Sequence, residues 1–247
     1  MDAPLFKRPG DGRLPQTDHF WLDDFQSGDF QSGKKQLKYR LYEPDGDTDR
    51  YPLVLWLHGF YGRGDHNVNQ IYVGFNEFGP AFFSNPERQT EFPSYVLAPQ
   101  CPGGKLWVKF RNNSSTRYLR WVIDLIDELQ TKHPIDPSRI YVAGQSMGGF
   151  ATWALLAEYP DRFAGAIPIC GGAPYRKLKR KMDTPVWAFH GDKDRLVRPW
   201  RTRRAVKVSE GRNVEVKYTQ YPEGSHFIGP QVFQEPELDS WLFSHSR

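Results

Sequence analysis

The sequence contains little of what several protein classes require. It has only two cysteines, Cys101 and Cys170, among 247 residues, which is too few for a disulfide scaffold. No Cys/His spacing is typical of a zinc site, so we expect no bound metal. We interpret both cysteines as small core residues, with a single disulfide between them as the alternative. No window approaches the roughly 18 uncharged apolar residues that a membrane-spanning helix requires.

An excess of one charge is also lacking, because 33 Lys and Arg residues face 29 Asp and Glu residues. Nucleic-acid binding needs a concentrated basic stripe and a reader motif, and the sequence has neither. The first thirty residues lack the apolar segment of a signal peptide. We therefore expect a small-molecule partner rather than a nucleic acid or a membrane, and either a cytoplasmic protein or the trimmed form of a secreted or periplasmic one. No pattern points to an oligomeric state.

Apolar runs bounded by turn residues alternate along the chain with helical patterns, and 38% of the residues are hydrophobic. This alternation is typical of parallel strands joined by crossover helices. Residues 52–58 and 94–98 are continuous apolar runs, as expected of strands covered on both faces, whereas 36–43 alternates and predicts a half-exposed antiparallel strand. Further strands are predicted at 139–143, 163–169, 185–189 and 214–221, and helices at 115–131, 148–159, 200–209 and 236–244.

No linker, repeat or low-complexity tract interrupts this pattern. We therefore predict a single α/β domain over residues 1–247, with an open, mostly parallel sheet of about eight strands and helices on both faces. Residues 1–35 are expected to form an N-terminal extension or edge strands. Residues 73–91 are rich in Phe and Asn and lack clear periodicity, which predicts a loop over the carboxyl edge of the sheet.

A candidate nucleophile lies between a predicted strand and a predicted helix. The motif Gly144-Gln145-Ser146-Met147-Gly148 follows its strand directly, which is the context that a nucleophile elbow requires. A serine on such a sharp turn has a strained backbone, and the small residues Gly144 and Gly148 relieve the crowding there. The helix N-terminus also offers N–H groups to developing negative charge. The alternative is a glycine-rich turn with an ordinary N-cap serine.

A serine hydroxyl is a weak nucleophile and needs a neighbouring base that a carboxylate orients. In folds with such an elbow, the order along the chain is Ser, Asp, His, with each residue at the carboxyl end of a strand. Asp194 follows the predicted strand at 185–189, and His226 follows the one at 214–221. We therefore predict Asp194 as the acid and His226 as the base.

Each of these two residues has a rival. Asp192 is the alternative carboxylate, but Asp194 lies further into the loop and has more reach. His190 precedes the acid loop, and we interpret it as a structural hydrogen-bonding residue rather than the base.

A second source of backbone N–H groups comes earlier in the chain. The strand predicted at 52–58 ends in His58-Gly59, and Phe60 follows. A His-Gly turn at this place brings backbone N–H groups beside the serine. We predict that the amides of Phe60 and Met147 form the oxyanion hole. The alternative is a turn that merely ends the strand.

These motifs together resemble the α/β-hydrolase superfamily, and within it the bacterial esterases described as predicted peptidases, phospholipase/carboxylesterase-like or dienelactone-hydrolase-like proteins. The resemblance implies a triad of Ser146, Asp194 and His226, with no metal or organic cofactor. Some dienelactone-type relatives use a cysteine nucleophile, so a serine at position 146 argues against dienelactone hydrolysis. The blocks that carry the resemblance are 52–65, 98–102, 135–149, 190–197 and 224–226.

The resemblance implies a serine carboxylic ester hydrolase that acts through an acyl-enzyme on a small, carbohydrate or aromatic-acid ester. A serine peptidase or thioesterase of the same fold is one alternative, and a non-catalytic binder on the same scaffold is another. The aromatic pair Phe60-Tyr61 predicts a narrowed acyl site or a stacking surface. We expect Tyr61, Trp107, Arg195 and Arg198 among the substrate contacts. The two guanidinium groups would hold a substrate carboxylate, unless they are solvated surface charges.

Overall fold

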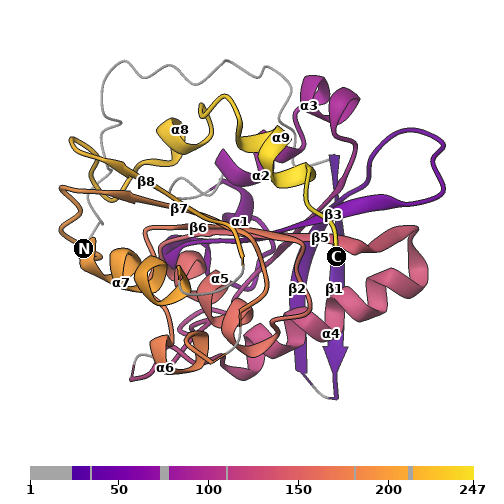
Figure 1. Ribbon diagram of the computed structural model, residues 1–247. Coiled ribbons are helices and arrows are strands. Elements are labelled where there is room, and N and C mark those ends of the chain that lie inside the picture. Colours follow the sequence, from indigo (N-terminus) through magenta and orange to yellow (C-terminus); the bar gives the residue numbers. More distant parts are fainter. Residues whose placement is uncertain (1–23, 34, 73–77, 110, 181, 211–213) are drawn as a thin grey trace.

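The computed structural model describes residues 24–33, 35–72, 78–109, 111–180, 182–210 and 214–247. Within these ranges the strands form one sheet of eight, in the order β1-β2-β4-β3-β5-β6-β7-β8 (Figure 1). β1 pairs antiparallel with β2, and β2 with β4, whereas the other pairs are parallel. The predicted eight-stranded, mostly parallel sheet is therefore confirmed. The strands are β1 (Phe25–Ser32), β2 (Lys35–Tyr42), β3 (Tyr51–Leu57), β4 (Tyr95–Pro99), β5 (Ile135–Gln145), β6 (Gly165–Ile169), β7 (Val186–Gly191) and β8 (Val216–Tyr221).

The burial of each strand follows its place in the sheet. β3 and β4 lie inside the sheet, and every position of both is buried, as their continuous apolar runs predict. β2 buries Leu37 and Leu41 and leaves Lys38 and Arg40 partly exposed, as the alternation there predicts. β1 lies at the edge, where edge strands were expected, and residues 1–23 lie outside the described ranges.

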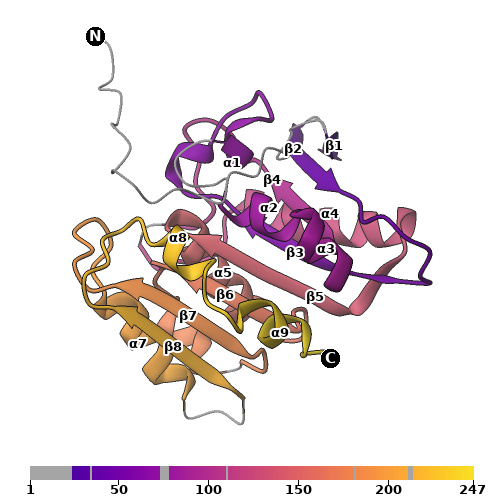
Figure 2. The ribbon, with the colours of Figure 1, turned by 90° about the horizontal axis from the view of Figure 1, so that it is seen from above.

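Helices cover both faces of the sheet (Figures 1 and 2). Apolar side chains of α4, α5, α6 and α7 join one core with Leu53 and Leu55 of β3. Those of α1, α2, α8 and α9 join the core on the opposite face with Val54 and Trp56, because successive strand residues point to opposite faces. The helices are α1 (Asn69–Tyr72), α2 (Phe78–Phe83), α3 (Pro86–Glu91), α4 (Arg117–Lys132), α5 (Met147–Glu158), α6 (Tyr175–Leu178), α7 (Trp200–Ser209), α8 (Gly229–Val232) and α9 (Leu238–Phe243), with a 3-10 helix η2 (Phe60–Gly62).

α4 and α5 differ in how they pack. The buried residues of α4, among them Val122, Ile126 and Leu129, recur at helical spacing on one face. α5 buries most of its side chains all round, which is typical of a helix inside the core. It begins at Met147, and only Ser146 separates it from the end of β5 at Gln145. Among the described residues, no helix combines the length and the apolar composition that a membrane span requires.

The prediction of a loop at 73–91 is wrong for its described part. Residues 78–91 form α2 and α3, and Phe82 and Phe83 pack into the core beside Trp56. The Asn85 side chain accepts hydrogen bonds from the first N–H groups of α3, which is the usual N-cap arrangement. Both helices have only six residues, so they are too short to show a helical period. Residues 73–77 lie outside the described ranges.

Candidate active site

Ser146 is the single residue between β5 and α5. Its backbone has φ 57° and ψ −115°, a region that non-glycine residues rarely adopt and that costs about 1–3 kcal/mol. Its N–H donates to the carbonyl of Ile169 on β6 (2.8 Å), and its carbonyl accepts from the N–H of Phe150 on α5 (2.9 Å). These two hydrogen bonds fix the turn that presents the serine hydroxyl at the carboxyl edge of the sheet.

Two glycines let α5 approach the end of β3 closely. A Cβ on Gly148 would lie 1.7 Å from the carbonyl oxygen of Leu57, and a Cβ on Gly144 would lie 2.8 Å from the same atom. Any other residue at Gly148 would push α5, and Ser146 with it, away from β3. The crowding that the elbow motif predicts is therefore contact with the backbone of β3.

The structure brings Ser146, His226 and Asp194 together. His226 Nε2 lies 2.8 Å from Ser146 Oγ, and His226 Nδ1 lies 2.6 Å from Asp194 Oδ2. The serine follows β5, the aspartate follows β7 and the histidine follows β8, so the carboxyl ends of parallel strands hold all three. With the Nδ1–H donating to the carboxylate, Nε2 can accept the proton of the serine hydroxyl.

Asp194 is buried and hydrogen-bonded through both carboxylate oxygens. Oδ1 accepts from the amides of Leu196 and Val197 (2.8 Å each), and Oδ2 faces the imidazoles of His226 and His190. Burial raises the pKa of this carboxyl, but the hydrogen bonds from His190 and His226 outweigh burial and hold the pKa below its ordinary value of 3.8. Asp194 is therefore an anion at neutral pH and can orient the base.

The two rivals of the predicted acid and base have other roles. Asp192 forms an ion pair with Arg203 (2.8 Å) in which both side chains are about half exposed. His190 is fully buried, and its Nε2 lies 3.0 Å from Asp194 Oδ2 while its Nδ1 lies 2.7 Å from Thr202 Oγ1. Asp192 thus lies on the surface, whereas His190 is buried behind Asp194 and forms hydrogen bonds there.

His58 fixes the turn after β3. Its Nδ1–H donates to the carbonyl of Gly59 (2.7 Å), and its Nε2 accepts from the amide of Cys101 (2.9 Å). The ring is fully buried, and burial lowers its pKa from 6.5 to about 4, so it is neutral at pH 7. Phe60 then begins η2, as Met147 begins α5. The first N–H groups of a helix have no intrahelical acceptor, which suits both amides to an oxyanion.

A pocket of about 220 Å³ lies over Ser146 and His226. Among the described residues, four large hydrophobic side chains are exposed, and three of them line this pocket. These three are Phe60 (47% exposed), Tyr61 (56%) and Leu196 (68%), and we call them the pocket rim. Clustered exposed apolar side chains mark binding surfaces. The other lining residues are Gly59, Gln145, Val197 and Phe227.

Part of the pocket rim is held in place by a cation. The guanidinium of Arg63 lies 3.4 Å from the centre of the Phe60 ring, and its Nε–H donates to the Phe60 carbonyl (2.9 Å). Tyr61 packs edge-on against the same ring at 5.8 Å. Such cation–π and edge-to-face contacts are favourable, so this side of the rim is formed before a ligand arrives.

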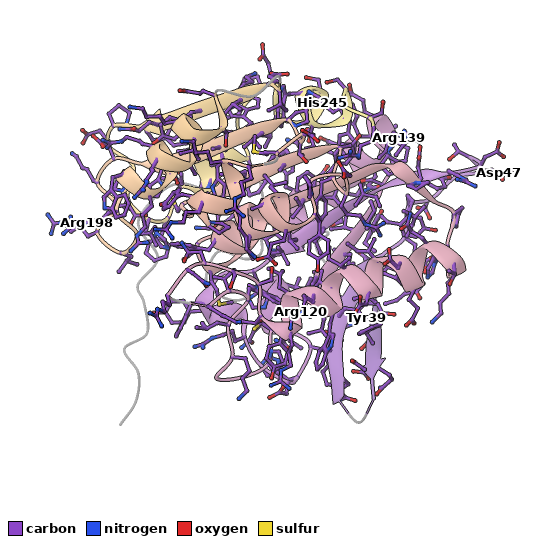
Figure 3. All side chains as sticks on the ribbon, turned by 60° about the horizontal axis from the view of Figure 1, so that its bottom comes forward. Tyr39, Asp47, Arg120, Arg139, Arg198 and His245 are labelled. Carbon is purple, nitrogen blue, oxygen red and sulfur yellow. The ribbon has the colours of Figure 1, made fainter. Side chains whose placement is uncertain are left out.

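The other predicted substrate contacts lie away from the pocket wall. Trp107 is fully buried, and its indole N–H donates to the carbonyl of His58 (3.3 Å). The prediction of Trp107 as a substrate contact is therefore wrong, because the ring supports the turn after β3 from behind. Arg195 and Arg198 are exposed and do not line the pocket, and Figure 3 shows Arg198 projecting from the edge of the molecule. Of these four residues, Tyr61 alone lines the pocket.

Several lining residues escaped the sequence reasoning. Leu196 and Phe227 lie within two residues of Asp194 and His226, and this closeness is the signal that could have identified them. Gln145 precedes the nucleophile, and its side-chain amide donates to the carbonyl of His226 (3.3 Å). No sequence pattern predicts that contact, which joins the end of β5 to a loop residue 81 positions later in the chain.

One group of described residues has donor atoms close enough to hold a metal ion. These are Cys170, His190 and Asp194, whose donor atoms lie within 4.8 Å of one another. Oδ2 of Asp194 already faces two imidazoles, and burial raises the pKa of the Cys170 thiol well above 9.0. A protonated thiol is a poor metal ligand. The group therefore fits hydrogen-bond support of the triad better than a metal site.

Comparison with known proteins agrees with this geometry. The profile of the dienelactone hydrolase family matches residues 37–231, which include all three triad residues. A crystal structure of a thermostable esterase superposes with a TM-score of 0.85 at 34% identity, over 92% of this chain and 64% of that one. The eight-stranded fold is thus that of the α/β hydrolases.

Two curated proteins show the same similarity in sequence. Poly(3-hydroxyalkanoate) depolymerase C of Paucimonas lemoignei is 30% identical over 166 residues, which are 61% of this chain and 35% of the depolymerase. Probable carboxylesterase SOBER1-like of Arabidopsis thaliana is 25% identical over 212 residues, 79% of each protein. The chain spans about a third of the depolymerase and less than two thirds of the thermostable esterase.

Proposed function

The chain belongs to the dienelactone hydrolase family, and on that premise we propose that it is a serine carboxylic ester hydrolase that acts through an acyl-enzyme. The observation that carries the proposal is the run of hydrogen bonds from Ser146 through His226 to Asp194, 2.8 and 2.6 Å long, beneath an open pocket. The names of the similar proteins, a polyester depolymerase and a carboxylesterase, describe cleavage of carboxylic esters. These two names favour an ester over a thioester, and the 30% identity of the depolymerase exceeds the 22% and 23% identity of two dipeptidyl-peptidases that also match.

In the proposed reaction, His226 Nε2 takes the proton of Ser146 Oγ while that oxygen attacks the ester carbonyl carbon. The amides of Phe60 and Met147 donate to the oxyanion that forms. The intermediate collapses, and the leaving alcohol receives the proton from His226. Water then attacks the acyl-enzyme by the same route and releases the acid. Throughout, Asp194 orients the imidazole and stabilises its charged form.

We propose a substrate with a small or flat acyl group. The pocket, at about 220 Å³, is smaller than the roughly 300–1,000 Å³ of sites for drug-sized ligands. Its rim is apolar and partly aromatic, which suits a short chain or a ring such as that of an aromatic acid. Esters of acetic acid on a sugar also fit these limits, whereas a long fatty acyl chain exceeds them.

A substrate panel tests the proposal. p-Nitrophenyl esters of increasing acyl length are compared with aromatic-acid esters, acetylated sugars, a thioester and a peptide amide. The expected result is the highest kcat/KM on short or aromatic acyl esters, with a fluorophosphonate labelling Ser146. Preference for the thioester or the peptide would assign the site to that hydrolase class instead. Absence of labelling and turnover together would indicate a non-catalytic binder.

A further inference from the structure

The hydrogen bonds around His190 determine where its protons lie. Thr202 Oγ1 lies 2.6 Å from the carbonyl oxygen of Gly171, which can only accept, so the single hydroxyl proton of Thr202 is used there. The same oxygen lies 2.7 Å from His190 Nδ1. Since Thr202 has no second proton to give, its oxygen must accept from the ring. His190 Nδ1 therefore carries a proton.

The opposite ring nitrogen also faces acceptors. His190 Nε2 lies 3.0 Å from Asp194 Oδ2 and 2.8 Å from the carbonyl oxygen of Val197. Asp194 is ionised, because its hydrogen bonds outweigh burial and hold its pKa below the ordinary value, so neither oxygen can donate. A bare lone pair on Nε2 would face two oxygens in a buried place, which is costly. His190 Nε2 therefore carries a proton as well.

We propose that His190 is a buried imidazolium, protonated on both ring nitrogens, and the second partner of the triad carboxylate. Oδ2 of Asp194 is then shared between His190 and the base, His226. His190 is a positioning residue, since it acts on the reaction through Asp194 and does not line the pocket. The effect on catalysis rests on the proposed function, whereas the protonation state of His190 does not.

The neighbouring groups leave this charge pair intact. Cys170 faces it from the end of β6, and burial raises the pKa of its thiol well above 9.0, so the thiol is neutral. His226, from the loop after β8, is neutral when it is ready to act as the base. Among the described residues, Asp194 is the anionic side chain that contacts His190.

α7, the helix packed against His190, places no second positive charge at the ring. α7 contacts the ring through the neutral hydroxyl of Thr202. The three arginines of α7 are engaged elsewhere. Arg203 pairs with Asp192, Arg201 lies 5.0 Å from the centre of the Trp200 ring, and Arg204 lies 4.5 Å from the centre of the Tyr175 ring. The charge of His190 is therefore balanced locally by Asp194.

A charge on His190 has a consequence for the base. An imidazolium beside Asp194 compensates part of the carboxylate charge and repels a second positive charge on His226. It therefore disfavours the protonated, inactive form of His226. Loss of the charge on His190 should move the acid limb of the kcat/KM profile to higher pH, by about one pH unit.

Nitrogen NMR tests the protonation state directly. The full chain is labelled with ¹⁵N-histidine, and the His190 ring is assigned as the signal set that disappears in His190→Gln. At pH 7 both of its nitrogens should show directly bonded protons. One unprotonated nitrogen in the His190 ring at pH 7 would overturn the proposal, whatever substrate the protein cleaves.

A set of threonine variants tests the effect on the base. Thr202→Val removes the acceptor of the Nδ1 proton, so the acid limb should move up by about one pH unit, whereas Thr202→Ser keeps the hydroxyl and the wild-type midpoint. Thr184→Val is the matched control, because Thr184 is buried and its hydroxyl donates to the carbonyl of Phe163 (3.2 Å). A lower kcat in Thr202→Val with an unmoved acid limb would show a merely structural role and overturn the proposal.

Discussion

Asp194, which lies behind the pocket-lining His226, is 2% exposed and its carboxylate takes part in four hydrogen bonds, whereas Leu196, two residues further along the same loop, is 68% exposed and lines the pocket. Several hydrogen bonds hold each reacting group beneath the pocket in place. The side chains of the pocket rim are exposed, and only a bound ligand would cover them. We therefore expect the buried hydrogen bonds to govern the rate of the reaction and the exposed rim to govern the choice of substrate.

The largest effect on the rate is expected from the substitution Ser146→Ala. The substitution removes the nucleophile and leaves the backbone turn, so ester hydrolysis should fall by roughly 10⁴–10⁶ in kcat while the melting temperature is kept. Steady-state kinetics and a thermal melt measure the two quantities. A variant that keeps a tenth of the wild-type rate would mean that another group makes the attack.

The next largest effect distinguishes two carboxylates of one loop. Asp194→Asn removes the anion that orients His226 and should lower kcat by about 10⁴. Asp192→Asn loses only an exposed ion pair with Arg203 and should change kcat by less than about twofold. The reverse ranking would identify Asp192 as the acid of the triad.

Acid pH should destabilise the fold through the buried ring of His58. Its pKa is lowered to about 4 in the fold, so below pH 6.5 the unfolded chain binds a proton that the folded chain does not. Stability is therefore full above pH 6.5 and declines as the pH falls toward 4. From pH 7 to pH 5 this loss is about 2 kcal/mol in the free energy of unfolding.

The His58→Gln variant isolates this loss from other titrations. Urea unfolding of both proteins at pH 7 and pH 5 gives the stability difference between them, in which groups common to both proteins, including His190, cancel. That difference should shrink by about 2 kcal/mol at pH 5. A difference that stays constant would show that the His58 ring accepts a proton in the fold as readily as in the unfolded chain.

The smallest effect is expected at the rim. Tyr61→Ser and Leu196→Ser remove apolar surface that would cover a ring on the substrate, so kcat/KM for a neutral aromatic-acid ester should fall about tenfold, with little change for an acetate ester. Arg195→Ser is the matched control, because Arg195 adjoins Leu196 and is exposed but does not line the pocket. Equal losses on both esters would mean that the rim supports the catalytic groups rather than selecting the substrate.

The features that could be predicted from the sequence each correspond to a local sequence pattern. Buried strands such as β3 are continuous apolar runs, and the elbow around Ser146 is a motif of five residues between a strand and a helix. The positions of Asp194 and His226 follow from the ends of two later strands. Because parallel strands end at one edge of the sheet, these local patterns are enough to predict that Ser146, Asp194 and His226 lie together.

Features that depend on contacts between distant segments could not be predicted in the same way. Trp107 donates to His58, 49 residues away, and an exposed tryptophan has the same sequence signal as this buried one. α2 and α3 are too short to display a period, so packing of Phe82 and Phe83 against β3 decides their structure. The contact between the His190 imidazole and Asp194 depends on the conformation of the acid loop, which no sequence motif predicts.

We expect Ser146 to carry the acyl group during turnover. The full chain is mixed with an excess of p-nitrophenyl acetate at low pH, where water attack on the acyl-enzyme is slow, and quenched in acid before intact and peptide mass spectrometry. We expect one added acetyl group, located on Ser146, that is absent from the Ser146→Ala variant. Rapid turnover of the same ester with no acetyl group on Ser146 at any quench time would show that Ser146 is not the nucleophile.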